Sequence, residues 1–254
     1  MQFRGQSAMA ECPLLVVDGL SKHFGGVVAN RAISLSVGAG EIHALIGPNG
    51  AGKTTFIAQL CGELQPDQGT VLFAGEDVTD WAPHRRARAG LARSFQITSV
   101  MPTLEVLENV VLAAAVPRGG AWHPWDPPDE SLRRDARAAL ARVGLDGRES
   151  LPAHRLSHGE QRLLEIAMMV ASRPRLLLLD EPAAGAGAQE SARIAALLRQ
   201  LGRDIAIVLV EHDMDLVFAV ADRITVLAEG ASIATGTPAE IRDNMEVRKA
   251  YLGD

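Results

Sequence analysis

Short apolar runs separated by glycine-rich turns occupy the first third of the chain. Four of them, at residues 14–17, 33–37, 42–46 and 70–73, have the length and apolar content of β-strands. Successive strands joined by tight turns favour antiparallel pairing. This part of the sequence predicts an antiparallel β element that packs against a core strand.

The middle of the chain has helical periodicity. Apolar residues recur at helical spacing over residues 103–115, 129–143 and 159–172, and Gly144 follows the second segment as a stop signal. Between the first two segments lies the stretch 117–128, which is too rich in proline and glycine to be regular. We expect three helices and one surface loop.

The last third alternates between strands and helices. Apolar runs at 176–179 and 205–210 predict strands, and the segments 189–201 and 214–221 predict helices. Uninterrupted apolar strands between helices are typical of a parallel sheet buried on both faces. The expected fold class is α/β, with a mainly parallel sheet, an N-terminal antiparallel β subdomain and an inserted α-helical subdomain.

Composition and charge exclude several classes of protein. A chain of 254 residues with 47% hydrophobic and 22% charged residues is an ordinary globular protein. Its net charge of -6 argues against a protein that mainly holds nucleic acid phosphates. No apolar run approaches the roughly 18 residues of a spanning helix, and no secretory signal is evident. Cys12 and Cys61 lack metal-type spacing, so we expect reduced thiols in the cytoplasm.

A glycine-rich turn carries the strongest chemical signal. Residues 47–54 match the pattern Gly-x4-Gly-Lys-[Ser/Thr], after an apolar strand and before a helix-compatible segment. Inward-turned backbone N–H groups and the helix dipole select a polyphosphate, which an ordinary glycine turn would not do. We expect Lys53 to reach the β- and γ-phosphates and Thr54 to ligate Mg²⁺. The expected nucleotide-binding residues are Gly47, Pro48, Asn49, Gly50, Ala51, Gly52, Lys53, Thr54 and Thr55.

Two acids end the apolar run that begins after Arg175. Asp180 could hold Mg²⁺ through water, and Glu181 could orient and deprotonate an attacking water molecule. Alone, the pair could also be two acids that end a strand in solvent. Together with Lys53, it predicts an ATP-hydrolysing site.

The segment Leu156-Ser-His-Gly-Glu-Gln161 resembles the signature of the nucleotide-binding subunits of ATP-binding cassette transporters. The resemblance extends over nearly the whole chain, although the family has glycine at His158 and glutamine at Glu160. Ser157 and Glu160 also form a capping box, and a capped helix N-terminus is an anion site. The resemblance implies that Ser157, His158, Gly159 and Glu160 contact the γ-phosphate held by a second subunit.

The same resemblance implies a P-loop NTPase (RecA-like) core and one ATPase domain over residues 1–254. The core would comprise about residues 10–95 and 174–254, and the helical insertion about residues 97–173. The implied cofactors are ATP and Mg²⁺.

Three further positions match family residues. Gln96 would ligate Mg²⁺ and link its site to the helical insertion, His212 would touch the γ-phosphate, and Phe24 would stack on adenine. Without the family, Phe24 would be read as a core residue and His212 as an ordinary histidine at a strand end. Ala186 and Gly187 depart from the usual leucine and aspartate or asparagine, and we expect the missing polar side chain to alter communication between the two ATP sites.

Four segments resemble the ATPases of bacterial branched-chain amino-acid importers most. They are residues 93–100, 210–215, 236–242 and 250–253. Urea and short-amide importers share much of this pattern, and a lipopolysaccharide-exporting ATPase is an alternative. The implied partners are a second ATPase subunit, identical or related, two transmembrane permease subunits and, indirectly, a substrate-binding protein. The implied location is cytoplasmic, on the inner face of the cell membrane.

Two other classes of protein use the same motifs. A soluble cassette ATPase of DNA repair or cofactor assembly would share the site, but the basic cluster 84–88 is the one hint of nucleic acid, and a solvated helix face explains it better. We therefore expect no nucleic-acid partner. A non-hydrolysing nucleotide switch is expected to lack the base, whereas Glu181 is present.

Overall fold

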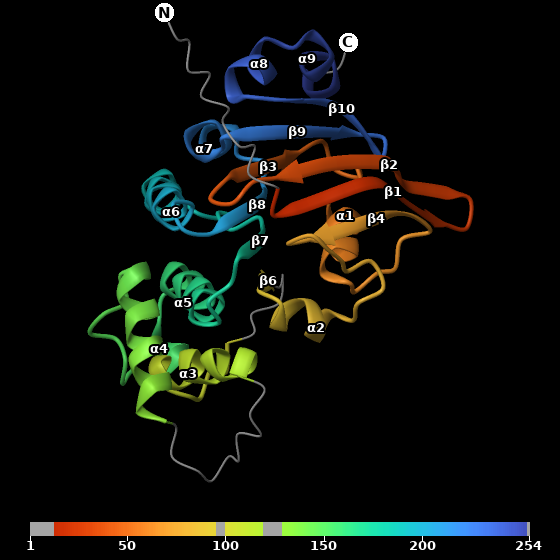
Figure 1. Cartoon of the computed structure of the whole chain (residues 1–254). Coiled ribbons are helices and arrows are strands. Elements are labelled where there is room, and N and C mark those ends of the chain that lie inside the picture. The colour runs from red at the N-terminus through yellow and green to blue at the C-terminus, as the bar shows by residue number, and fades with distance from the viewer. Residues whose placement is uncertain (1–12, 95–99, 119–128, 253–254) are drawn as a thin grey trace, which may run out of the picture.

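A six-stranded sheet forms the centre of the computed structural model (Figure 1), which describes residues 13–94, 100–118 and 129–252. The strand order is β10-β9-β3-β8-β7-β6, and all neighbours are parallel except β10 and β9. Strands β3, β7 and β8 are buried along their whole length, as expected for a parallel sheet covered on both faces. The strands are β3 (Ile42–Ile46), β6 (Leu91–Arg93), β7 (Leu176–Asp180), β8 (Ala206–Val210), β9 (Arg223–Ala228) and β10 (Ala231–Gly236).

A second, antiparallel sheet comes mainly from the N-terminal part of the chain. Its order is β2-β1-β4-β5, with β1 (Leu15–Phe24), β2 (Val27–Val37), β4 (Gln68–Phe73) and β5 (Glu76–Asp77). Strands β1 and β2 form one long hairpin whose register shifts at several points. They extend well beyond the predicted strands. The prediction stopped short because the added residues include polar side chains such as Asp18, Lys22, Asn30 and Arg31, which interrupt the apolar pattern.

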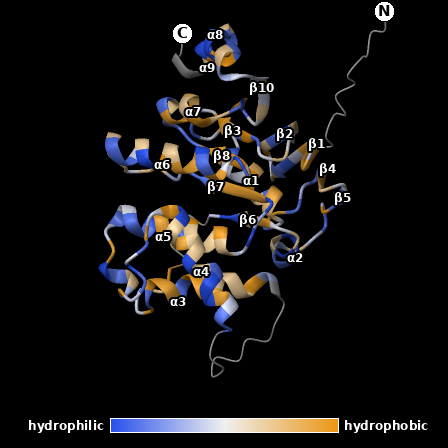
Figure 2. Ribbon diagram, turned by 60° about the vertical axis from the view of Figure 1, so that its left-hand side comes forward, coloured by the Kyte–Doolittle hydropathy of each residue, from blue (hydrophilic) through white to orange (hydrophobic). Residues whose placement is uncertain are grey.

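Helices cover both faces of the central sheet. Helix α1 (Lys53–Cys61) packs between the two sheets, whereas α6 (Ala188–Leu201) packs on the opposite face together with α5 (His158–Ala171). Alternate residues of β7 and β8 belong to these two cores, as the two-residue period of a strand requires. A smaller core joins β3 and β9 to α7 (Met214–Val220). In Figure 2 strand β7 has the hydrophobic colour, in agreement with its buried position.

Three helices inserted between β6 and β7 gather at one end of the molecule (Figure 1). They are α3 (Val106–Ala115), α4 (Glu130–Val143) and α5 (His158–Ala171), and they pack on one another. Helix α4 ends at Gly144, which has the left-handed conformation expected of a stop. The predicted helix bounds are right to within three residues. The bounds predicted for the whole insertion, about residues 97–173, stay a prediction.

The predicted fold class is confirmed. Strand β3 has the bounds that the sequence predicts, whereas several short elements were missed. Besides β5, β6, β9 and β10, these are α2 (Pro83–Arg88), α8 (Pro238–Asp243), α9 (Met245–Leu252) and the short helices Val116–Arg118 and Ala153–Arg155. Within the described ranges, no helix combines the length and the apolar character that crossing a membrane requires.

Candidate functional site

The glycine-rich turn joins the end of β3 to the start of α1. Two of its glycines fill positions where no side chain fits. A Cβ on Gly47 would lie 2.3 Å from the carbonyl oxygen of Leu227, and one on Gly52 would lie 2.2 Å from that of Ala29. Gly52 also has φ 93, a left-handed conformation that favours glycine. The turn is therefore pressed against neighbouring backbone on one side.

Helix α1 begins at Lys53 without a side-chain cap. Its N-cap residue is Gly52, which has no side chain to accept hydrogen bonds from the first turn. The N–H groups of Lys53, Thr54 and Thr55 have no acceptor within the helix, and the helix dipole adds positive charge there. Such an end is a preformed site for a phosphate group. The geometry fits the role predicted for residues 47–55.

Lys53 is buried and lies across the turn. Its Nζ donates hydrogen bonds to the carbonyl oxygens of Gly47 at 2.6 Å and Pro48 at 3.0 Å. Burial lowers the pKa of Lys53, and the negative charges of Glu181 and Asp180 oppose this shift. The predicted phosphate-binding cation and the two predicted catalytic acids thus share one site.

Two side chains that sequence analysis missed hold the turn in place. Asn30, fully buried on β2, donates to the carbonyl oxygen of Gly52 at 3.1 Å. Gln59 on α1 in turn donates to the Asn30 amide oxygen at 2.7 Å. No sequence pattern marks either residue, because the contact joins two elements far apart in the chain.

Asp180 ends β7 in a buried position. Its backbone N–H donates to the Ser94 hydroxyl at 3.0 Å, and its Oδ2 atom is buried with no hydrogen-bond partner. Burial raises the pKa of this carboxyl group, whereas the positive charge of Arg93 opposes that rise. A buried carboxylate oxygen without a donor fits a hydrated, oxygen-liganded cation such as Mg²⁺.

Glu181 follows in a strained backbone conformation. Its φ of 49 is unusual for a residue other than glycine, and such strain is frequent at active sites. The N–H of Glu181 donates to the carbonyl oxygen of Val210 at 2.8 Å. Its carboxylate is partly exposed and lies 3.8 Å from His212 Nδ1. The structure therefore brings the predicted base and the predicted γ-phosphate contact together at an edge that water reaches.

Arg162 holds the backbone of Asp180 and Glu181 in place. From helix α5, its guanidinium donates to the carbonyl oxygens of Asp180 at 3.1 Å, Glu181 at 3.0 Å and Pro182 at 3.2 Å. It also forms an ion pair with Glu165 on the same helix. Sequence analysis missed Arg162, because its donors go to backbone groups.

Glu211 connects the two loops beside Glu181. This fully buried carboxylate accepts hydrogen bonds from the N–H groups of Ala183 at 2.9 Å and His212 at 3.0 Å. One charged group therefore positions the segment after the acids and the segment that carries His212. The only signal in the sequence is an acid beside that histidine.

The signature-like segment opens helix α5. Ser157 is the N-cap, and the predicted capping box with Glu160 is present. The hydrogen bonds from the Ser157 backbone and hydroxyl lower the pKa of Glu160. Ser157, His158, Gly159 and Glu160 line a cavity of about 770 Å³ together with the N-terminal part of α6. His158 also lines a cavity of about 340 Å³ that Asp180 and Glu181 border.

The remaining predicted positions differ in their surroundings. Phe24 ends β1 with 51% of its surface exposed, so its core reading is wrong, and the Lys22 ammonium lies 5.9 Å from the centre of its ring. Gln96 lies outside the described residues. Gly187 is the N-cap of α6 and gives that helix no side-chain cap, which the usual aspartate or asparagine could provide.

Comparisons with known proteins show the family of the chain. Residues 30–184 match the family described as ABC transporter, and residues 233–254 match a family described as branched-chain amino acid ATP-binding cassette transporter. The chain is 38% identical over 251 residues to the high-affinity branched-chain amino acid transport ATP-binding protein BraF of Pseudomonas aeruginosa, covering 95% of this chain and 98% of the relative. LivG of Escherichia coli, which has the same description, gives the same identity and coverage.

A solved structure of similar shape is the ADP conformation of MJ1267, an ATP-binding cassette of an ABC transporter. It superposes with a TM-score of 0.87 at 28% identity and covers 96% of this chain and 100% of that chain.

Proposed function

The chain belongs to the ATP-binding cassette (ABC) transporter family and is one of its ATPase subunits, and from that premise we propose that it energises the uptake of branched-chain amino acids or related small amides. The observation that carries the substrate proposal is the 38% identity to BraF and LivG over 95% of the chain. The C-terminal match at residues 233–254 supports the same class of importer.

ATP binds through the turn between β3 and α1 in this proposal. The amides of residues 47–55 surround the phosphates, and Lys53 leaves its two carbonyl acceptors to pair with the β- and γ-phosphates. Thr54 and the free oxygen of Asp180 would hold Mg²⁺, and Gln96 is a further predicted ligand. Bound Mg²⁺ would neutralise charge on the phosphates.

Hydrolysis takes place beside Glu181. Its partly exposed carboxylate orients and deprotonates water for in-line attack on the γ-phosphate. His212 and Lys53 stabilise negative charge on the transferred group. Arg162 and Glu211 hold the segments that carry Glu181 and His212 in position through hydrogen bonds to their backbone.

A second subunit completes each site. Ser157 and Gly159 of one copy would face the γ-phosphate bound by the other copy, in a head-to-tail dimer. The cavity in front of α5 supports this arrangement, because the first N–H groups of a helix have no acceptor within it and can bind an anion. Phe24 would stack on adenine from the tip of β1.

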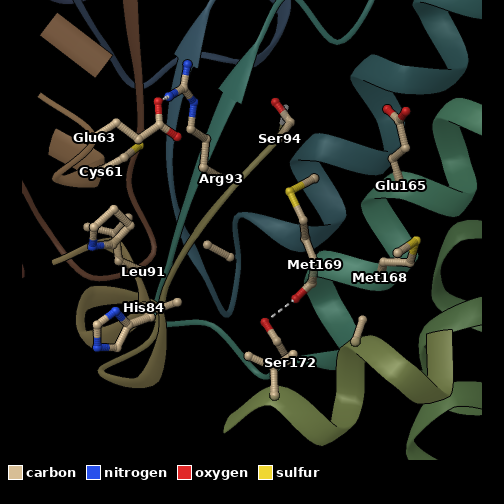
Figure 3. Close-up of a pocket in the computed structure, with 15 residues that line it drawn as sticks. Cys61, Glu63, His84, Leu91, Arg93, Ser94, Glu165, Met168, Met169 and Ser172 are labelled. Carbon is tan, nitrogen blue, oxygen red and sulfur yellow. Dashed lines mark hydrogen bonds and ion pairs between the residues drawn. The ribbon is translucent and has the colours of Figure 1, made fainter. Parts of the chain in front are cut away.

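Permease subunits would dock between the sheet and the inserted helices. An apolar pocket of about 340 Å³ lies there, lined from the α2–β6 side and from α3 and α5 (Figure 3). Ser94, which lines it, is the last described residue before the stretch of sequence that carries Gln96. A segment of a permease in this pocket would place the chain on the inner face of the cell membrane. A substrate-binding protein would act on the chain only through the permease.

Transport by a reconstituted complex tests the proposal. The chain would be purified with the permeases encoded beside it and placed in vesicles. ATP would be enclosed in the vesicles, and a substrate-binding protein would be added outside them. We expect uptake of labelled leucine that depends on ATP, and no uptake by the Glu181→Gln variant. ATP-dependent release of lipopolysaccharide, or failure of any permease to copurify, would instead contradict the importer assignment.

A further inference from the structure

Arg93 lies between two carboxylates that belong to different parts of the molecule. It ends β6, where its Nη1 donates a hydrogen bond to Glu63, which follows α1. Its Nη2 lies 4.0 Å from Asp180 Oδ2, which is beyond hydrogen-bond distance. Figure 3 shows the Arg93 and Glu63 side chains against each other at the edge of the pocket, with the Cys61 thiol beside them.

Arg93 hydrogen-bonds Glu63, whereas its contact with Asp180 is a longer ion pair without a hydrogen bond. The Arg93 side chain is 10% exposed, so water has little access to its guanidinium. Its Nε has no acceptor, and Asp180 Oδ2 has no donor, although both atoms are buried. A shift of the guanidinium toward Asp180 would satisfy that oxygen, but it would remove the oxygen that the proposed function assigns to the cation.

The Arg93 guanidinium and a divalent metal ion would compete for the Asp180 carboxylate. By holding Arg93, Glu63 reduces this competition. A guanidinium that hydrogen-bonds Asp180 would occupy its free oxygen and repel a divalent ion nearby. A guanidinium held by Glu63 leaves the oxygen open while it still lies close enough to balance part of the negative charge. The position of one arginine thus sets how readily Asp180 accepts a hydrated metal ion.

We propose that the Glu63–Arg93 pair tunes the Mg²⁺ affinity of the nucleotide site, with Glu63 holding Arg93 away from Asp180. The proposal rests on the function assigned above, in which Asp180 binds Mg²⁺. Arg93 and Glu63 are positioning residues, since neither is placed to touch ATP. Opposite effects follow from removing the two members of the pair.

Binding of a fluorescent, non-hydrolysable ATP analogue to the full chain measures this effect without turnover. Mg²⁺ is titrated at fixed pH and ionic strength, and the concentration that gives half of the Mg²⁺-dependent binding is recorded. We expect Glu63→Gln to raise this concentration about threefold and Arg93→Met to lower it about threefold, in line with partly exposed ion pairs. The double variant should behave like Arg93→Met, because Glu63 acts only through the arginine.

Arg142→Met provides the matched control. It removes an arginine from an ion pair with Asp204. That residue precedes β8, at the amino ends of the strands, whereas Asp180 lies at their carboxyl ends. We expect no change in the Mg²⁺ dependence. Shifts of both pair variants in the same direction, or no shift in either, would overturn the proposal. If Arg93→Met does not fold, Glu63→Gln alone decides, because an unchanged or lowered Mg²⁺ requirement contradicts the proposal.

Asp180→Asn separates this inference from the proposed function. If wild-type binding depends on Mg²⁺ and Asp180→Asn removes that dependence, the metal assignment stands whatever the pair variants do. If Asp180→Asn leaves the Mg²⁺ dependence intact, the assignment of Asp180 fails, and the inference fails with it.

Discussion

The Nη2 atom of Arg162 lies 3.0 Å from the carbonyl oxygen of Glu181, so the helix that begins at the signature-like segment also holds the predicted base. Glu181 has a left-handed backbone conformation, which persists only where neighbouring groups fix it. Arg162 supplies such support through three carbonyl contacts.

Arg162→Lys should slow hydrolysis without weakening nucleotide binding. Lysine keeps the charge but lacks the planar fork of donors that spans the three carbonyl groups. We expect kcat to fall about tenfold, the equivalent of one charge-assisted hydrogen bond of ~1.5 kcal/mol. Steady-state kinetics and calorimetric ATP titration separate the two quantities. Arg137→Lys, in an exposed ion pair, serves as control, and a variant that loses ATP affinity in proportion to kcat would contradict this role.

Glu181→Gln should nearly abolish turnover while ATP binding persists. The amide keeps the shape of the side chain but cannot accept a proton from water. A general base typically contributes a factor of roughly 10² to 10⁴, and the loss of kcat should lie in that range. Phosphate release measures turnover, and gel filtration with ATP detects the expected dimers. Hydrolysis at the wild-type rate would remove Glu181 from its role.

Lys53→Ala should weaken nucleotide binding itself. The ammonium group is buried beside the turn, and its pairing with phosphates replaces hydrogen bonds to two carbonyl groups. Hydrogen bonds to charged groups suggest a loss of about 10- to 100-fold in affinity. Calorimetry measures the change, with Lys249→Ala on the exposed side of α9 as control. Unaltered ATP affinity would contradict the assignment of the turn.

The central elements were predictable because their patterns are local. Strand β3 is an apolar run bounded by glycines, and β7 ends in two acids, so both could be placed from the sequence. Strand β9 was missed because only Ala221 and Asp222 separate it from helix α7. The outer half of β2 is held by pairing with β1 rather than by an apolar pattern.

The site was predictable where a residue acts through its own motif and unpredictable where it acts through a neighbour's backbone. Lys53 lies close enough to Asp180 and Glu181 for their charges to raise its pKa, as expected of motifs that share a site. Asn30, Arg162 and Glu211 bind peptide groups of distant segments, and such contacts leave no spacing to read. They become visible only once the sheet order brings those segments together.

Cys61 should resist thiol reagents and should report on stability at high pH. Burial raises the pKa of its thiol to about 12, with the charge of Arg93 opposing that rise. The folded form therefore favours the neutral thiol. The contribution of this thiol to the free energy of unfolding is fully present below the pKa of the unfolded chain, near 9, and is lost as the pH rises toward 12.

Urea unfolding of the wild type and of Cys61→Ala, compared at pH 7.5 and pH 10, measures this effect. The wild type should lose more stability than the variant between the two pH values. Alkylation of Cys61 at pH 8, followed by peptide mass spectrometry, should be slow until the chain unfolds. Rapid labelling of the native protein would contradict the buried position.

Glu190 should oppose dimer formation through its charge. A Cβ on Gly159 would lie 1.9 Å from Glu190 Oε1, so this carboxylate lies against the residue proposed to face a partner's γ-phosphate. A second negative group arriving there is repelled unless Glu190 moves away. In a Glu181→Gln background, adding Glu190→Gln should tighten the ATP-dependent dimer about threefold, and the gain should shrink at high salt. Sedimentation with ATP measures the dimer, and Glu246→Gln on α9 is the control for a lost negative charge. An unchanged dimer would contradict this role of the Glu190 charge. A weaker dimer would show instead that Glu190 stabilises the dimer.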